Sequence, residues 1–173
     1  MPITRLNHAV LYVRDVARSA AFYTEVLGFR PISMGPDGSS IPGAAFLQAP
    51  GSTNDHDLGL FEIGSGAGHT TAGRDQVGLY HLAWEVDTLE ELERLAVRLQ
   101  QAGSLVGASD HSTTKSLYAK DPDGIEFEVA WIVPADRLDA VTASGRASVK
   151  PLDLEATKER FGATTKGGVG ISH

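Results

Sequence analysis

The sequence contains no cysteine among its 173 residues. This absence excludes disulfide bonds, thiolate metal ligands and a cysteine nucleophile. A chain without cysteine is compatible with a reducing compartment, and a strand pattern begins within the first few residues in place of a signal peptide. We therefore expect a cytoplasmic protein.

Positive charge and long apolar runs are also scarce. Lys and Arg number 15 against 22 Asp and Glu, which gives a formal net charge of -7, and no stretch is rich in Lys or Arg. A protein that binds nucleic acid needs a basic surface, so we expect no nucleic-acid partner. No uninterrupted apolar run is long enough to cross a membrane, so we expect no membrane partner. The 42% apolar and 21% charged residues are typical of a soluble globular protein.

What the sequence does contain is an internal repeat. Each half has a strand pattern, then a helix pattern that ends in glycine, then three further strand patterns. Asp15 and Thr88 are suited to cap the two helices, and Gly28 and Gly103 to end them. The expected strands lie at 5–13, 29–33, 44–48 and 57–63 in the first half, and at 78–86, near 105, at 115–120 and at 125–133 in the second.

This order predicts an α+β fold made of two βαβββ modules that bury their apolar faces together. A loop rich in Gly and Thr, from Gly64 to Gly73, marks the boundary between the modules. After the repeat, a helix pattern at 152–161 is followed by a Gly-rich end that we expect to be a mobile tail. The expected segments are a domain over 1–133 with modules of about 1–66 and 74–133, and a C-terminal extension over 134–173.

Three side chains of the repeat point to a metal site. His8 and His81 occupy equivalent positions at the first strand of each half, and Glu128 lies on the last strand of the second half. Two imidazoles and one carboxylate suit a divalent first-row metal ion and leave coordination positions for a substrate. A single histidine is more often part of a core, and Glu128 alone could pair with a cation at a sheet edge. Its strand is otherwise apolar, however, so burying Glu128 there without a partner or a metal would be costly.

Four segments of the chain, taken in order, resemble the vicinal oxygen chelate superfamily of glyoxalases, fosfomycin-resistance proteins and extradiol dioxygenases. The segments read NHAVLYVRDVARSAAFYTEVLGF, HDLGLF, YHLAWEV and SLYAKDPDGIEFEV. The resemblance implies that the two modules form one cupped mixed β-sheet around a metal. It also implies that His8, His81 and Glu128 are the metal ligands.

The position of a fourth ligand distinguishes the members of this superfamily. Glyoxalases that resemble this chain take a second glutamate from the last strand of the first module. Aligned by the segment HDLGLF, that position holds Leu60; aligned by the pair Phe-Glu, it holds Glu62. We favour Leu60, because HDLGLF resembles the dioxygenases, in which its histidine, here His56, is the acid and base of the active site.

The resemblance therefore favours a small extradiol dioxygenase, an oxidoreductase of aromatic catabolism. It implies that a catechol-type substrate is chelated to Fe(II) and opened by dioxygen, with Mn(II), Ni(II) or Zn(II) as alternative metals. His56 would exchange the substrate proton, and Tyr118 and His111 would stabilise negative charge on oxygen. Alternatively, His56 and His111 are surface histidines and Tyr118 is a core aromatic.

Two other functions stay open at this point. One is a glyoxalase-like isomerase or lyase, which would use Glu62 as a ligand; the other is a metal-free resistance module that binds a small molecule. Many extradiol dioxygenases carry four modules, whereas this chain has two, so the walls of the pocket would come from the extension or from a second subunit. We expect a homodimer.

Overall fold

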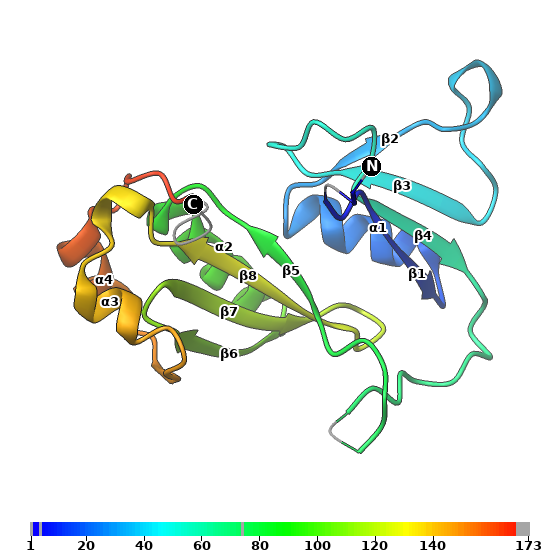
Figure 1. The fold of residues 1–173 in the computed structure, drawn as a ribbon. Helices are drawn as coiled ribbons and strands as arrows, with labels where there is room; N and C mark the ends of the chain where they lie inside the picture. Colours follow the sequence, from blue (N-terminus) through cyan, green and yellow to red (C-terminus); the bar gives the residue numbers. More distant parts are fainter. Residues whose placement is uncertain (1, 4, 74, 169–173) are drawn as a thin grey trace. The chain divides into compact units, whose positions relative to one another are not determined.

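The computed structural model describes residues 2–3, 5–73 and 75–168 (Figure 1). The chain divides into two compact units. Unit 1 comprises Met1–Thr70 together with Pro122–Gly124, and unit 2 comprises Thr71–Asp121 together with Ile125–His173. None of the helices within the described ranges has the length and apolar character that crossing a membrane requires.

Unit 1 contains a four-stranded sheet and one long helix. The strands stand in the order β1-β4-β3-β2, with β1 and β4 parallel and the other neighbours antiparallel. The helix α1 contacts β3 and β4 (Figure 1). The elements are β1 (Ala9–Val13), α1 (Val16–Glu25), β2 (Arg30–Ile32), the 3-10 helix η1 (Pro36–Gly38), β3 (Ala44–Gln48) and β4 (Leu58–Glu62).

The two faces of this sheet differ in character because side chains alternate along each strand. One face carries buried aliphatic side chains from three strands, and the buried Tyr23 of α1 adds to this core. The buried strand residues are Leu11, Val13, Leu47, Leu58 and Leu60. On the opposite face Val10 and Tyr12 are exposed. His8 lies two residues before Val10, so the alternation places it on this same face.

Unit 2 repeats the order and adds the extension. Its sheet has the order β5-β8-β7-β6-β9, with β5 and β8 parallel. The helix α2 is capped by Thr88, whose hydroxyl accepts from Glu91 N–H, and buries four leucines. The elements are β5 (Leu82–Glu85), α2 (Leu89–Gln101), β6 (Leu105–Asp110), β7 (Thr114–Lys120), β8 (Glu126–Ile132), η2 (Ala135–Arg137), α3 (Ala140–Ser144), β9 (Lys150–Pro151) and α4 (Leu154–Phe161).

The extension packs on unit 2. Phe161 of α4 is buried with its ring 5.6 Å from that of Trp131. Beyond α4, in the segment for which we predicted a mobile tail, Trp131 Nε1 donates to Thr165 O at 3.2 Å and Gly167 N to Asp87 O at 2.6 Å. The end of that tail, residues 169–173, lies outside the described residues.

The α+β class and the two βαβββ modules are thus confirmed. Both predicted caps form: the Asp15 carboxylate accepts from Arg18 N–H at 2.9 Å, and Thr88 caps α2. Gly28 and Gly103, which follow the two helices, have φ of +80° and +67°, a region in which a side chain is strained.

Candidate metal centre and neighbouring residues

His8 lies in unit 1, one residue before β1. Its Nδ1 is 2.7 Å from Asn7 Oδ1, an oxygen that can only accept, so Nδ1 carries the hydrogen. This arrangement leaves the lone pair of Nε2 for another partner. A histidine that binds metal through one nitrogen usually donates from the other in this way.

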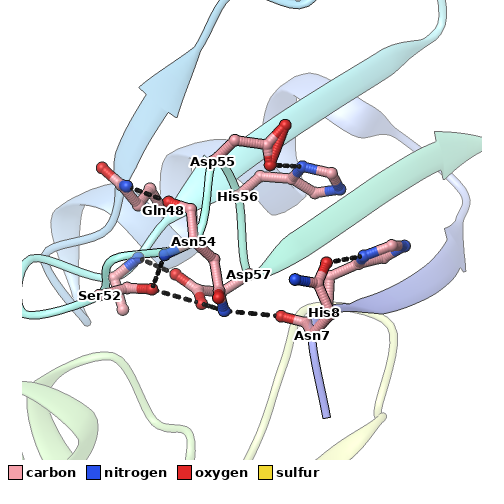
Figure 2. A network of polar contacts seen from close by, with 9 residues as sticks. Asn7, His8, Gln48, Ser52, Asn54, Asp55, His56 and Asp57 are labelled. Carbon is pink, nitrogen blue, oxygen red and sulfur yellow. Dashed lines mark hydrogen bonds and ion pairs between the residues drawn. The ribbon is translucent and has the colours of Figure 1, made fainter. Parts of the chain in front are cut away.

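His56 lies beside His8 at the end of the loop before β4. The centroids of the two rings are 4.5 Å apart, and Phe46 contacts His56 edge-on at 5.3 Å. His56 Nδ1 is 3.0 Å from the carboxylate of Asp55, so it donates there and Nε2 is left as the basic atom (Figure 2). His56 is buried, with 9% of its surface exposed, whereas most of the Asp55 side chain is exposed to water.

A buried carboxylate, that of Asp57, holds the loop that carries His56. Asp57 Oδ2 accepts from Ala49 N–H at 2.8 Å, and Oδ1 accepts from Ser52 Oγ and Asn54 Nδ2, both at 2.7 Å (Figure 2). Asn54 Nδ2 also donates to Asn7 O at 2.7 Å. The loop is therefore fixed to the residue before His8. This role of Asp57 was not predicted from the sequence, although Ser, Asn and Asp clustered before a strand are a signal for such turns.

The strand register identifies the residue of unit 1 that corresponds to Glu128, and it corrects our alignment. In unit 2, Ala83 lies two residues after His81 and pairs with Glu128. In unit 1, Val10 lies two residues after His8 and pairs with Gly59. A Cβ placed on Gly59 would lie 3.5 Å from Val10 Cγ2, which puts it on the His8 face.

Neither Leu60 nor Glu62 therefore occupies the fourth position. Leu60 is fully buried on the opposite face, in register with Leu11. Glu62 follows the same alternation and is exposed, and its Oε2 accepts from Val16 N–H at 3.0 Å at the start of α1. The alternation of side chains along β4 was compatible with either alignment. It separates the residues of β4 into two faces, but it does not say which face lies on the same side of the sheet as His8.

In unit 2, His81 and Glu128 converge. His81 Nε2 is 3.1 Å from Glu128 Oε2, and both side chains are largely buried. The other carboxylate oxygen, Oε1, accepts from the hydroxyl of Ser116, a fully buried residue on β7. Among the described residues, His81 Nδ1 is buried without a hydrogen-bond partner. The donor set of this pair, one imidazole nitrogen and one carboxylate oxygen, fits a divalent cation.

Tyr118 and His111 lie near this pair. Tyr118 is in register with Glu128, and its ring centroid is 5.8 Å from that of His81. Burial raises the pKa of Tyr118 above its ordinary value, and the charge of Glu128 raises it further. The Tyr118 hydroxyl is 3.0 Å from His111 Nε2. Tyr118 is thus neutral and hydrogen-bonded at neutral pH.

The structure groups the predicted site residues by unit. His8 and His56 come together in unit 1, and His81, Glu128, Tyr118 and His111 come together in unit 2. Within the ranges that the structure describes, no group of three or more potential metal-binding side chains is close enough to hold an ion.

Comparison with known proteins identifies the family. The family described as the Glyoxalase/Bleomycin resistance protein/Dioxygenase superfamily matches residues 5–129, and the chain belongs to it. A solved structure of a glyoxylase/bleomycin resistance protein/dioxygenase domain from Frankia sp. EAN1pec superposes with a TM-score of 0.59 at 25% identity, covering 75% of this chain and 92% of that one.

Two curated relatives are dioxygenases by name. A biphenyl-2,3-diol 1,2-dioxygenase from Pseudomonas sp. (strain KKS102) is 33% identical over 135 residues, and a catechol-2,3-dioxygenase from Bacillus subtilis (strain 168) is 31% identical over 126. Each match covers 73% of this chain and 41% of the relative. The chain thus spans about two fifths of the length of these relatives.

Proposed function

We propose that the protein is an extradiol dioxygenase that opens the ring of a catechol-type aromatic substrate bound to Fe(II). The observation that carries the proposal is the sheet face of unit 2, on which His81 and Glu128 converge and Tyr118 and His111 form a hydrogen-bonded pair beside them. The dioxygenase relatives support the same reading.

The metal would be held by His81 and Glu128, with His8 as the third ligand. The nitrogen and oxygen donors present suit Fe(II), and Mn(II), Ni(II) and Zn(II) are alternatives with the same donor preference. When bound, such an ion brings two vicinal substrate oxygens and dioxygen together and carries electron density between them.

His56 would move the proton of the substrate. Imidazole exchanges protons readily near neutral pH, and the Asp55 carboxylate orients the ring so that Nε2 is the basic atom. The buried network around Asp57 keeps this ring against His8. His56 Nε2 would accept a substrate hydroxyl proton and return it later in the reaction.

Tyr118 and His111 would contact the substrate oxygens on the unit 2 side. The raised pKa of Tyr118 keeps its hydroxyl protonated at neutral pH, so it acts as a hydrogen-bonding group and not as an anion. His111 supports it through the bond at 3.0 Å. With its proton directed at His111, the Tyr118 oxygen would accept a hydrogen bond from a substrate hydroxyl and orient the substrate for reaction.

Gly59 argues against a glyoxalase-like site with four ligands. The repeat-equivalent position of Glu128 has no side chain, and the carboxylate of Glu62 is already hydrogen-bonded to the start of α1. A metal-free resistance module would not need to retain His8, His81 and Glu128. The homodimer that we expect from the sequence is a further part of this proposal.

Anaerobic reconstitution with Fe(II) tests the function. The loaded protein is mixed in air with catechol, 3-methylcatechol and 2,3-dihydroxybiphenyl, and the yellow ring-opened product is followed by absorbance. We expect product with at least one substrate, and loss of both bound iron and product in His81→Ala and Glu128→Ala. Iron bound without turnover of any catechol would contradict the reaction, and no bound metal would contradict the metal site.

A further inference from the structure

His111 is held between two partners, of which one, a backbone carbonyl, can only accept a hydrogen bond. Its Nδ1 lies 3.1 Å from the backbone carbonyl oxygen of Ser148, in the C-terminal extension. A carbonyl can only accept, so Nδ1 donates and carries the hydrogen. The lone pair of Nε2 then faces the Tyr118 hydroxyl at 3.0 Å, and this hydroxyl is the donor. The extension therefore determines which nitrogen of His111 is protonated.

The turn that follows His111 is strained and locked. Ser112 has φ of +67° and is the one non-glycine residue with a positive φ among those the structure describes. Its N–H donates to Asp110 Oδ1 at 2.6 Å, and its carbonyl accepts from Lys115 Nζ at 3.0 Å. Lys115 is buried and also pairs with Asp110. Such strain persists only where the surroundings fix the backbone.

The extension supplies part of that fixation. The Ser112 hydroxyl donates to Thr142 O at 2.8 Å in α3, and β9 pairs with the end of β6 at Asp110 and Lys150. Gly145 leaves room for this approach. A Cβ on Gly145 would stand 2.6 Å from Ser112 Oγ and 2.9 Å from Ser112 Cβ, closer than real Cβ contacts come.

We propose that residues 142–151 of the extension position the pair formed by His111 and Tyr118. The Ser148 carbonyl holds His111 in the tautomer with hydrogen on Nδ1, so that Nε2 accepts the proton of the Tyr118 hydroxyl as a hydrogen bond. The Tyr118 oxygen then presents lone pairs and accepts a hydrogen bond from a substrate hydroxyl. The catalytic part of this inference rests on the proposed function, whereas the tautomer does not.

The tautomer can be read by 15N NMR of the histidine side chains in the full-length, metal-free protein. His111→Gln identifies the signals of His111. We expect a protonated Nδ1 and an unprotonated Nε2 near neutral pH. A proton on Nε2 in the wild-type protein would overturn the proposal.

Two variants test the role of the extension without touching the catalytic groups. Gly145→Ala pushes Ser112 away, and Ser112→Gly removes the link to Thr142 while relieving the backbone strain. We expect both to mix the two tautomers, and to lower kcat on a catechol at least tenfold with iron per chain unchanged. Ser148→Ala keeps the carbonyl and is the control that should match wild type.

These outcomes separate the two proposals. A wild-type tautomer in Ser112→Gly would overturn the positioning role even if Gly145→Ala did not fold, because Ser112→Gly introduces no clash. If the predicted tautomer is found and lost in the variants, the positioning role stands, and a failure to turn over catechols then counts against the proposed function alone.

Discussion

At the scale of single residues, Ser116 is the contact that best explains the orientation of Glu128. The hydroxyl is fully buried and donates to one carboxylate oxygen, while the other oxygen faces His81. Partners that orient a ligand in this way are typically worth a factor of about 10–100 in metal affinity. We propose that the site depends on Ser116 through this hydrogen bond, although Ser116 is not one of the proposed ligands.

We therefore expect Ser116→Ala to weaken Fe(II) or Zn(II) binding by about 10–100-fold. Competition titration against a chromophoric chelator measures the affinity. Ser116→Thr retains the hydroxyl and should lose less. If Ser116→Ala binds as tightly as wild type, the hydrogen bond does not orient Glu128.

Glu62 provides a matched test of the three-ligand site. Glu62→Gln keeps an oxygen that can accept from Val16 N–H and removes the charge. We expect it to bind as much metal as wild type, in contrast to Glu128→Gln. Metal analysis of both proteins, purified without chelator, makes the comparison. A Glu62→Gln protein without metal would show that Glu62 is a ligand after all.

Asp139 gives a prediction for pH. Hydrogen bonds from Thr142, first from its backbone N–H, and then the Arg160 guanidinium lower the pKa of this exposed carboxyl below 3.8. A lowered pKa in the folded state stabilises the protein above the unfolded-state pKa, and this gain is lost as the pH falls through the folded-state pKa. Wild type should therefore have a higher free energy of unfolding than Asp139→Ala, and this difference should be largest at neutral pH.

Denaturant unfolding at several pH values checks this prediction. Below the folded-state pKa, well into the acid range, the difference between wild type and Asp139→Ala should shrink, because the protonated carboxyl loses its charge while an oxygen can still cap the helix. Asn is also a good N-cap, so Asp139→Asn should differ less from wild type at neutral pH. A difference that is constant across the acid range would contradict a contribution from the charge.

At the scale of elements, the sequence was sufficient to predict the two modules and the helix caps, but not the register between paired strands. Asp15, Thr88 and the glycines after each helix are local signals, because a cap is made within a few residues. The choice among Gly59, Leu60 and Glu62 depends on hydrogen bonds between β1 and β4, which lie far apart in the chain. A shift of one residue exchanges the two faces of a strand, so no local pattern resolves it.

The candidate site shows the same division. His8 and His81 were accessible as candidates from the repeat, in which they occupy equivalent positions, and Glu128 as a carboxylate on an otherwise apolar strand. The contacts of Asp57, Ser116 and Ser148 were not, because each depends on a segment distant in sequence or on a loop without periodicity.

The helix α4 should contribute to the stability of unit 2 itself. Phe161 is buried against Trp131, and Lys115 Nζ and the Arg160 guanidinium lie over its ring. Replacing a buried Phe by Ala typically costs about 3–5 kcal/mol. We expect Phe161→Ala to lower the free energy of unfolding by about this amount in urea titrations, whereas Val141→Ala, at an exposed position of α3, should change it little. Equal stability of Phe161→Ala and wild type would mean that the extension is only loosely attached.

At the scale of the whole molecule, each of the two units carries its own group of candidate site residues. Unit 1 brings His8 and His56 together, and unit 2 brings together His81, Glu128 and the pair of Tyr118 and His111. The family membership is shown by the match over residues 5–129. The dioxygenase reaction is our proposal. It requires that both oxygen atoms of one dioxygen molecule are incorporated into the ring-opened product.

Mass spectrometry of the product formed from catechol under 18O-labelled dioxygen tests this requirement most directly. With the Fe(II)-loaded protein, the account predicts ring-opened product that carries two labelled oxygen atoms, apart from exchange with water, and none with Glu128→Ala. Product whose carboxylate carries no labelled oxygen, or the same labelled product from Glu128→Ala, would contradict a dioxygenase centred on this site.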